Sequence, residues 1–396
     1  MTGLRVIELC SNIAGPVAGT IFGDLGADVV KVERPEGGDD VRGWAPPLWN
    51  GISARFRAVN RNKRSIALDL RRDADREALT RLVRQADVLL HNMRPGAMEA
   101  LDLSADQALA LNPRLIYCAI SAFGAAGPWR ERSGYDGLAQ ALSGQMAGNG
   151  QPDSEPTLVA DALVDKGAGM WAAIGVLAAL MRRGATGRGG VVETSLLEAS
   201  LFWRDNVFAV YGASGRSPPR PGNGSQMIVP YGVYATADHP IMLGCAGDGL
   251  FALLARLLDR ADWLMDPRFA TNAARVAHRA EIEGQLTTVL QTRPRDAWVE
   301  LLGGNRIPCG PILVTEEAYA HPQVQALGIF QSAPGADMPL VSAPWSLDGV
   351  RPPVWRGAPA LGEDDFAVTE ATWSEPAIAP PSIRSDAAGR DQAEGD

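Results

Sequence analysis

The first 121 residues alternate short apolar runs with segments whose apolar residues recur every three or four positions. The short runs are rich in Val, Ile and Leu, which favours buried strands, and the longer spacing is typical of amphipathic helices. Strands alternating with helices predict an α/β fold with a doubly wound, Rossmann-like parallel sheet. We expect strands at residues 4–9, 28–33, 65–70, 87–92 and 115–121, with helices at 16–26, 73–86 and 104–111.

The pattern changes after a Pro- and Gly-rich stretch at residues 214–226. Two runs, YGVYAT and PIMLGCAG, then indicate an antiparallel strand pair, and helical patterns follow at residues 249–259, 280–291 and 294–302. This make-up predicts a smaller α+β domain, and the polar, acidic C-terminus predicts a disordered tail. The expected division is a large domain at 1–200, a linker at 201–226, a small domain at 227–325, a return to the large domain at 326–373, and the tail at 374–396.

Composition narrows the classes of function. The chain has 396 residues and a formal net charge of −9, and this acidic balance without a dense Lys/Arg stripe argues against nucleic-acid binding. Its four cysteines are far apart and form no CxxC pair, so we expect neither a disulfide nor a metal site. The N-terminus shows no signal peptide, and the uncharged run at 167–181 is short for a membrane span. We therefore expect a cytoplasmic protein with no membrane partner.

Ligands of a doubly wound sheet bind beyond the carboxyl ends of its strands, where this chain has loops rich in Gly, Pro, Arg and Asn. None of these loops carries GxGxxG, and SNIAGP does not match the dinucleotide fingerprint. The stretch GATGRGG follows a helix, so it is not a Walker loop. The sequence therefore disfavours a nicotinamide cofactor.

Asp165 stands directly before the uncharged run, which we interpret as a buried helix. A carboxylate at a helix N-terminus meets free backbone N–H groups and the positive end of the dipole, so it should stay ionised. Two interpretations follow. Asp165 can be the N-cap residue, which these residues alone favour, or a nucleophile towards an activated carbonyl. Asp161 is the nearby second candidate for the nucleophile.

Several segments, in order along residues 3–370, together resemble the class III CoA-transferase family, which includes formyl-CoA and carnitine CoA-transferases and the α-methylacyl-CoA racemases. The similar segments include GLRVIELCSNIAGPVAG, NRNKRSIALDL, ADVLLHNMRPGAMEALDL, SGYDGLAQALSG, TGRGGVVETSLLEA and PALGEDDFAV. The resemblance implies a homodimer of two interlocked chains. It also implies coenzyme A bound as the acyl-CoA substrate, with no tightly bound cofactor. The family's aspartate nucleophile falls on Asp165.

The resemblance also implies positions for CoA. Ile13 and Ala14 would approach the pantetheine or pyrophosphate with backbone atoms, and Arg34 would bind a phosphate. Tyr135 and Asp136, in SGYDG, would lie near the thioester. The positions that would surround the nucleotide are Leu68, Arg71, Asn92, Met93 and Arg94.

Two departures from the family pattern affect this assignment. Ala100 stands where the family often has a basic residue, which puts one phosphate contact in doubt. The Gly-run loop of oxalate-type members is absent, and PGNGSQM at residues 221–227 lies in the corresponding region. We therefore expect the lid and the acceptor specificity to differ.

As a transferase, the protein would use Asp165 to attack an acyl-CoA donor, carry CoA as an aspartyl thioester, and pass it to a carboxylic acid acceptor. Backbone N–H groups near Asp165 and a glycine-rich loop would stabilise the oxyanion. Candidate acids include dicarboxylates such as succinate, malate or mesaconate, and carnitine-like acids.

Two alternatives stay open. A racemase or epimerase needs two acid/base groups, and the racemases pair this Asp with a His thirty residues earlier, where Tyr135 stands here. Because a Tyr with its ordinary pKa is a poorer base at neutral pH, transfer is favoured. The other alternative is a non-catalytic acyl-CoA-binding protein on the same fold.

Overall fold

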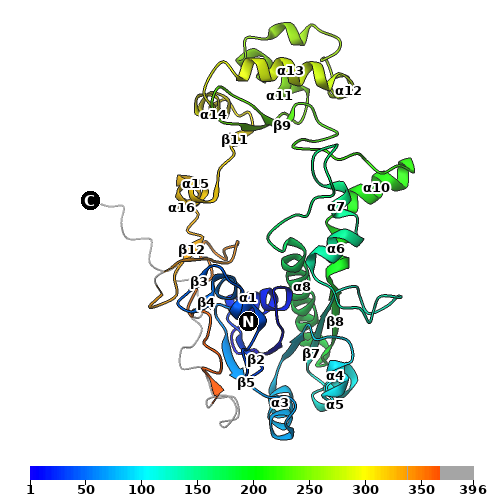
Figure 1. The fold of residues 1–396 in the computed structure, drawn as a ribbon, viewed down its shortest axis with the longest axis vertical. Coiled ribbons are helices and arrows are strands. Elements are labelled where there is room, and N and C mark those ends of the chain that lie inside the picture. Colours follow the sequence, from blue (N-terminus) through cyan, green and yellow to red (C-terminus); the bar gives the residue numbers. More distant parts are fainter. Residues whose placement is uncertain (337, 366–396) are drawn as a thin grey trace. The chain divides into compact units, whose positions relative to one another are not determined.

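A computed structural model describes residues 1–336 and 338–365 (Figure 1). The expected tail at 374–396 lies outside the described residues. The chain divides into two compact units, of which the first contains residues 1–145, 159–208 and the stretch from 327 onward. The second contains residues 146–158 and 209–326.

The first unit is built on a six-stranded sheet with the order β5-β2-β1-β6-β7-β8, and every neighbouring pair is parallel. The strand order reverses between β1 and β6, which makes this the topological switch point where ligands of such sheets bind. The expected α/β fold with a parallel sheet is confirmed. The strands are β1 (Arg5–Leu9), β2 (Asp28–Glu33), β5 (Arg64–Ala67), β6 (Val88–His91), β7 (Ile116–Ser121) and β8 (Gly190–Ser195).

Helices cover both faces of this sheet. Helices α1 (Ala14–Asp24) and α8 (Leu163–Thr186) share one core cluster with the sheet, while α3 (Asp73–Gln85) and α5 (Ala105–Leu111) share the other. Side chains alternate along a strand, so Val6 of β1 joins the first cluster and its neighbour Ile7 joins the second.

Helix α8 has 24 residues and is therefore longer than the uncharged run at 167–181. Its length and composition would allow it to cross a membrane, yet Ala168, Ala172 and Val176 are fully buried in the core cluster shared with α1. The two helices approach closely at Gly169, where a Cβ atom would come within 2.5 Å of the Ala14 carbonyl oxygen. We therefore interpret α8 as a core helix.

Shorter elements complete the first unit. The return segment covers the edge of β5, because Asp364 accepts a hydrogen bond from the Ser65 N–H at 3.0 Å and donates its own N–H to the Ser65 carbonyl at 2.9 Å. The remaining elements are η1 (Asp40–Gly43), β3 (Leu48–Trp49), β4 (Ile52–Ser53), α2 (Ala54–Ala58), α4 (Ala97–Ala100), α6 (Asp136–Leu142), α9 (Leu196–Phe202), β12 (Phe330–Gln331) and β13 (Leu340–Val341).

The second unit contains the expected antiparallel pair, β9 (Tyr231–Tyr234) with β10 (Ile241–Gly244), and a third strand, β11 (Cys309–Pro311). The sequence did not predict β11, because three residues with Gly and Pro carry no strand pattern. The helices are η2 (Ala261–Leu264), α11 (Asp248–Leu257), α12 (Asn272–Ala277), α13 (Arg279–Leu290), α14 (Arg295–Gly304), α15 (Thr315–Ala320) and α16 (Pro322–Ala326).

Two helices lie where the chain passes between the units, α7 (Gln145–Gly148) and α10 (Asp205–Ser214). The range 201–226, expected as a linker, therefore holds the end of α9 and the whole of α10. The Pro- and Gly-rich stretch begins only where α10 ends.

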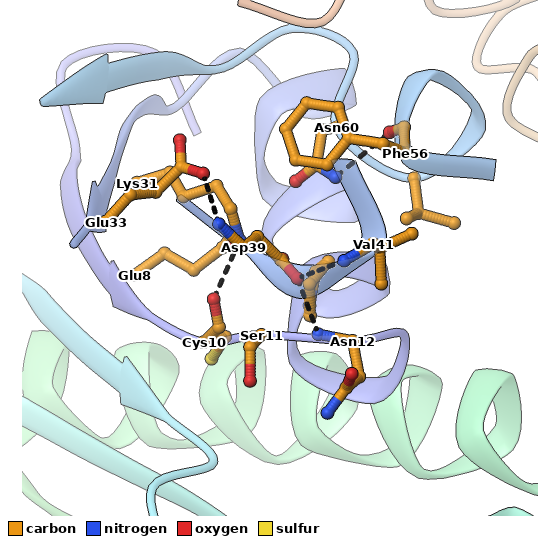
Figure 2. A network of polar contacts seen from close by, with 12 residues as sticks. Glu8, Cys10, Ser11, Asn12, Lys31, Glu33, Asp39, Val41, Phe56 and Asn60 are labelled. Carbon is orange, nitrogen blue, oxygen red and sulfur yellow. Dashed lines mark hydrogen bonds and ion pairs between the residues drawn. The ribbon is translucent and has the colours of Figure 1, made fainter. Parts of the chain in front are cut away.

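Four charged side chains form a buried network beside the ends of β1 and β2. Figure 2 shows three of them, Glu8, Lys31 and Asp39. Lys31 Nζ lies 3.0 Å from Glu8 Oε1 and 2.9 Å from Asp39 Oδ2, and Lys63 Nζ lies 2.8 Å from Glu8 Oε2. Burial disfavours the charge on Lys31, but Glu8 and Asp39 outweigh it and raise its pKa. Burial lowers the pKa of Lys63 to about 8, although Glu8 opposes this.

The network holds the loops that follow the first two strands. Asp39 Oδ1 accepts hydrogen bonds from the N–H groups of Asn12, at 3.2 Å, and Val41, at 3.1 Å. Lys31 Nζ also donates to the Cys10 carbonyl at 2.7 Å. Figure 2 shows the bonds from Asn12 and Val41 meeting at Asp39. The backbone at the switch point is thus fixed by side chains from outside the β1–α1 loop.

We predict that Lys31→Met lowers the free energy of unfolding by about 3–5 kcal/mol, because it leaves Glu8 and Asp39 buried without their shared cation. Urea unfolding followed by circular dichroism measures this change. The matched control is Arg34→Met, which removes an exposed pair with Asp40 and should change stability little. Equal effects of the two substitutions would contradict the role given to the buried network.

Candidate active site

A cavity of about 450 Å³ opens at the carboxyl edge of the parallel sheet. Its lining includes Asn12 and Ile13, from the loop after β1, and Trp44, which follows η1. Further lining residues come from α2 and from the N-terminal ends of α6 and α8. Five segments distant in sequence therefore meet around one small space. Asp165 is part of the lining.

Asp165 is the third residue of α8, not its N-cap residue. The helix begins at Leu163, and Ala162 occupies the N-cap position without a capping side chain. Asp161 and Ala162 both have left-handed backbone conformations, with φ of 65° and 50°. This turn starts the helix earlier than the sequence indicated, so the N-cap interpretation of Asp165 is wrong.

Asp136 of α6 provides the cap that α8 lacks. Its Oδ2 accepts hydrogen bonds from the N–H groups of Val164, at 2.8 Å, and Asp165, at 3.0 Å. Gln140 donates to the other carboxylate oxygen and also bonds the backbone of Val159 in both directions, each at 2.9 Å. Asp136 is therefore a positioning residue that fixes the start of α8.

Burial, followed by the charge of Asp136, raises the pKa of Asp165 to about 7. The expectation that the helix keeps Asp165 fully ionised is therefore wrong, because desolvation and a neighbouring carboxylate outweigh the favourable dipole. The expected oxyanion donors also need correction. The N–H groups of Val164 and Asp165 are occupied by Asp136, and that of Lys166 donates to the Ala162 carbonyl.

The other residues expected near the thioester also line the cavity. Tyr135 precedes α6 and is 63% exposed, at the position where the racemases have a His. Asp161, the second candidate for the nucleophile, is exposed on the same cavity. Within the part of the chain that the structure describes, none of the residues that line the cavity is a His.

Apart from Tyr135 and Asp136, eight positions are expected to bind CoA, and they follow the ends of four neighbouring strands. Of these eight, Ile13 lines the cavity. Asn92 joins the two loops at the switch point, because its side chain accepts from the Ser11 N–H at 3.0 Å and donates to the Ser11 carbonyl at 2.7 Å. Leu68 is buried in the core, whereas Arg94 and Met93 are exposed.

Two of the expected phosphate-binding arginines form exposed ion pairs near the same edge. Arg34 pairs with Asp40, and Arg71 pairs with Asp69 at 2.7 Å. The remaining expected position, Ala14, is the buried first residue of α1.

Sequence reasoning did not identify three other lining residues, Trp44, Arg55 and Lys166. The first two lie in a region of short elements without a clear period. Lys166 follows Asp165 directly, and neighbouring side chains on a helix point in different directions, so nothing in the sequence pattern places Lys166 in the same site.

Comparison with known proteins agrees with this architecture. The family model described as CoA-transferase family III matches residues 1–365. A succinate–glutarate CoA-transferase of Agrobacterium fabrum is 38% identical over 378 residues, covering 93% of this chain and 94% of that protein. An acetyl-CoA:oxalate CoA-transferase of Acetobacter aceti is 35% identical, covering 93% and 96%.

A solved structure of a CAIB/BAIF family protein from Brucella suis has 37% identity and a TM-score of 0.83, covering 93% of this chain and 97% of that one. The sheet, the cavity at its carboxyl edge and these matches lead to one conclusion. The chain belongs to CoA-transferase family III and is an enzyme of this class.

Proposed function

We propose that the protein moves CoA from an acyl-CoA donor to a carboxylic acid through an aspartyl-CoA thioester on Asp165. The observation that carries this proposal is the Asp165 carboxylate on a small cavity at the carboxyl edge of the sheet, with its pKa raised to about 7. Strongly perturbed carboxylates in clefts are typical of reacting groups. Relatives named for acid pairs such as succinate and glutarate support the reaction class.

The reaction proceeds by exchange of acyl groups. An Asp165 carboxylate oxygen attacks the donor thioester, the carbon–sulfur bond breaks, and a mixed anhydride and CoA thiolate form. The thiolate attacks the Asp165 carbonyl and releases the donor acid, which leaves an aspartyl-CoA thioester. The acceptor carboxylate then attacks this thioester, and the same steps in reverse yield the new acyl-CoA.

The surroundings of Asp165 favour these covalent states. Its carboxylate is partly desolvated and lies near the charge of Asp136, and both effects disfavour the ionised form. An anhydride or thioester at Asp165 is neutral, so acylation relieves both costs. A carboxylate with a higher pKa is also more basic and a better nucleophile in its ionised form.

For CoA itself we propose the loops after β1, β2, β5 and β6. Arg34, Arg71 and Arg94 supply guanidinium groups for the phosphates, and Ile13 and Ala14 lie beside the pantetheine. The pairs of Arg34 and Arg71 with Asp40 and Asp69 are exposed, so a phosphate can replace the carboxylate at little cost. Tyr135 and Asp136 lie at the thioester end.

We predict that Asp165→Ala abolishes transfer while CoA binding, measured by calorimetry, is retained. Wild-type enzyme incubated with an acyl-CoA and then borohydride should show reduction of the Asp165 thioester to homoserine by mass spectrometry. Asp161→Asn is the matched control, because Asp161 lines the same cavity and Asn tolerates its left-handed conformation. Turnover by Asp165→Ala, or an adduct on Asp161, would refute the assignment.

The pKa of Asp165 predicts the pH dependence. Only the ionised carboxylate attacks, so kcat/KM should fall below about pH 7, approaching about tenfold for each further pH unit. Asp136→Asn removes a charge that raises this pKa while retaining an oxygen that accepts hydrogen bonds. The midpoint should therefore move to lower pH in this variant.

Asp161→Asn again serves as the control for the pH profile, because Asp161 is not among the causes of the Asp165 shift. Its midpoint should match that of the wild type. An unchanged midpoint in Asp136→Asn would show that Asp136 does not set the nucleophile's pKa.

We further propose that the enzyme is an interlocked homodimer. Helix α10 supports this proposal, because it has no buried residue although Phe208, Val210 and Tyr211 are exposed on it at 46%, 41% and 52%. Contiguous exposed apolar side chains are typical of interaction surfaces. Light scattering should give twice the mass of one chain, and Phe208→Asp should weaken association. A monomeric wild type would contradict the proposal.

A further inference from the structure

We propose that Arg55 binds the second carboxylate of a dicarboxylic acyl group, so that the enzyme selects dicarboxylic over monocarboxylic acids. This inference rests on the proposed transfer through Asp165. It assigns a specificity-determining role to a side chain outside the reacting centre.

The geometry of α2 directs Arg55 into the cavity. Arg55 and Ala58 lie at positions i and i+3 of α2, which share one face of a helix, and both line the cavity that contains Asp165, as does Val59 directly after the helix. Phe56 is fully buried, and Arg57 stacks on Trp49 with 4.7 Å between the guanidinium carbon and the ring centroid. The Arg55 side chain of this short helix thus lines the cavity, whereas the Arg57 side chain packs on Trp49.

The guanidinium of Arg55 differs from its neighbours in its contacts. Arg57 donates to the Trp49 carbonyl at 3.0 Å, and Arg42 forms a two-pronged pair with Glu33 at 2.6 and 2.7 Å. Within residues 1–336 and 338–365, the Arg55 side chain forms neither an ion pair nor a hydrogen bond. Its five donors are therefore available to a ligand in the cavity.

The backbone that carries Arg55 is held firmly. The Val59 carbonyl accepts from Thr20 Oγ1 at 2.6 Å and from the buried Lys63 Nζ at 3.0 Å. Asn60 donates to the Phe56 carbonyl at 3.0 Å, and Ser53 Oγ accepts from the Arg55 N–H at 3.2 Å. The anchored backbone reduces the ordering cost of binding an anion.

Charge explains why the cavity needs this cation. A dicarboxylic acyl group enters with one carbonyl in the thioester and one free carboxylate. The lining already carries the carboxyl groups of Asp136, Asp161 and Asp165, which would repel that carboxylate. A guanidinium binds a carboxylate through two parallel hydrogen bonds, which makes Arg55 the matching group. The apolar Ala58 and Val59, which line the same cavity, suit the methylene chain.

The test uses succinyl-CoA and butyryl-CoA, whose acyl chains have equal length and end in a carboxylate or a methyl group. The rate of Asp165 thioester formation is measured in single turnovers by borohydride trapping, without an acceptor. The wild type should react faster with succinyl-CoA. Arg55→Gln should reduce the apparent second-order rate for succinyl-CoA about 10- to 100-fold, the effect of losing charge-assisted hydrogen bonds, and change that for butyryl-CoA little.

Three further variants sharpen the result. Arg55→Lys should restore part of the succinyl-CoA rate, since it keeps the charge but loses the fork. Arg57→Gln, on the same helix but outside the cavity, should leave the ratio of the two rates unchanged. Lys166→Met tests the other cation of the lining, and a loss of selectivity there with none in Arg55→Gln would overturn the assignment.

The outcomes separate the two proposals. A wild type that forms no Asp165 adduct with either thioester refutes the proposed function. A wild type that forms the adduct without preferring succinyl-CoA refutes only the role of Arg55. An equal loss for both thioesters in Arg55→Gln also refutes it, and would mean that Arg55 contacts the CoA portion they share.

Discussion

The arrangement of the whole site depends on the charge balance among Glu8, Lys31, Lys63 and Asp39. Two anions and two cations lie together without access to solvent, and each is compensated by the others. Such a cluster tolerates little displacement, because a lost contact leaves a charge in a medium of low polarity. Its members come from β1, β2, the loop after β2 and the segment before β5. The cluster therefore ties together the segments whose backbone surrounds the cavity.

A second constraint acts on Asp165, the proposed nucleophile. The carboxylate of Asp136 holds the first turn of α8 through two backbone N–H groups, and its charge contributes to the raised pKa of Asp165. Asp136 thus contributes both to the position of Asp165 and, after burial, to its raised pKa. A neutral cap would hold the helix without the charge, and a distant charge would perturb Asp165 without holding the helix.

The sequence alone predicts the first five strands of the sheet well, since they are short apolar runs whose ends agree with the structure within three residues. It also identifies Asp165 as the central carboxyl group. It misplaces Asp165 relative to the helix start, because the left-handed conformations of Asp161 and Ala162 leave no sequence signal. Arg55 escapes notice because five residues are too few to display a helical period. The buried charge cluster of Glu8, Lys31, Lys63 and Asp39 is not predicted either, since a charged residue in a strand ordinarily indicates a solvent-facing position.

In helix α2, the contacts that anchor the helix differ from the side chains that line the cavity. Its anchors include the main-chain carbonyl oxygens of Phe56 and of Val59, which directly follows the helix, whereas its face towards the cavity consists of side chains. Main-chain anchors survive almost any change of side chain. The residue at position 55 can therefore be exchanged during evolution, or by an engineer, with little disturbance of the scaffold. With the proposed role of Arg55, one substitution at this position is expected to redirect the enzyme from one class of acid to another.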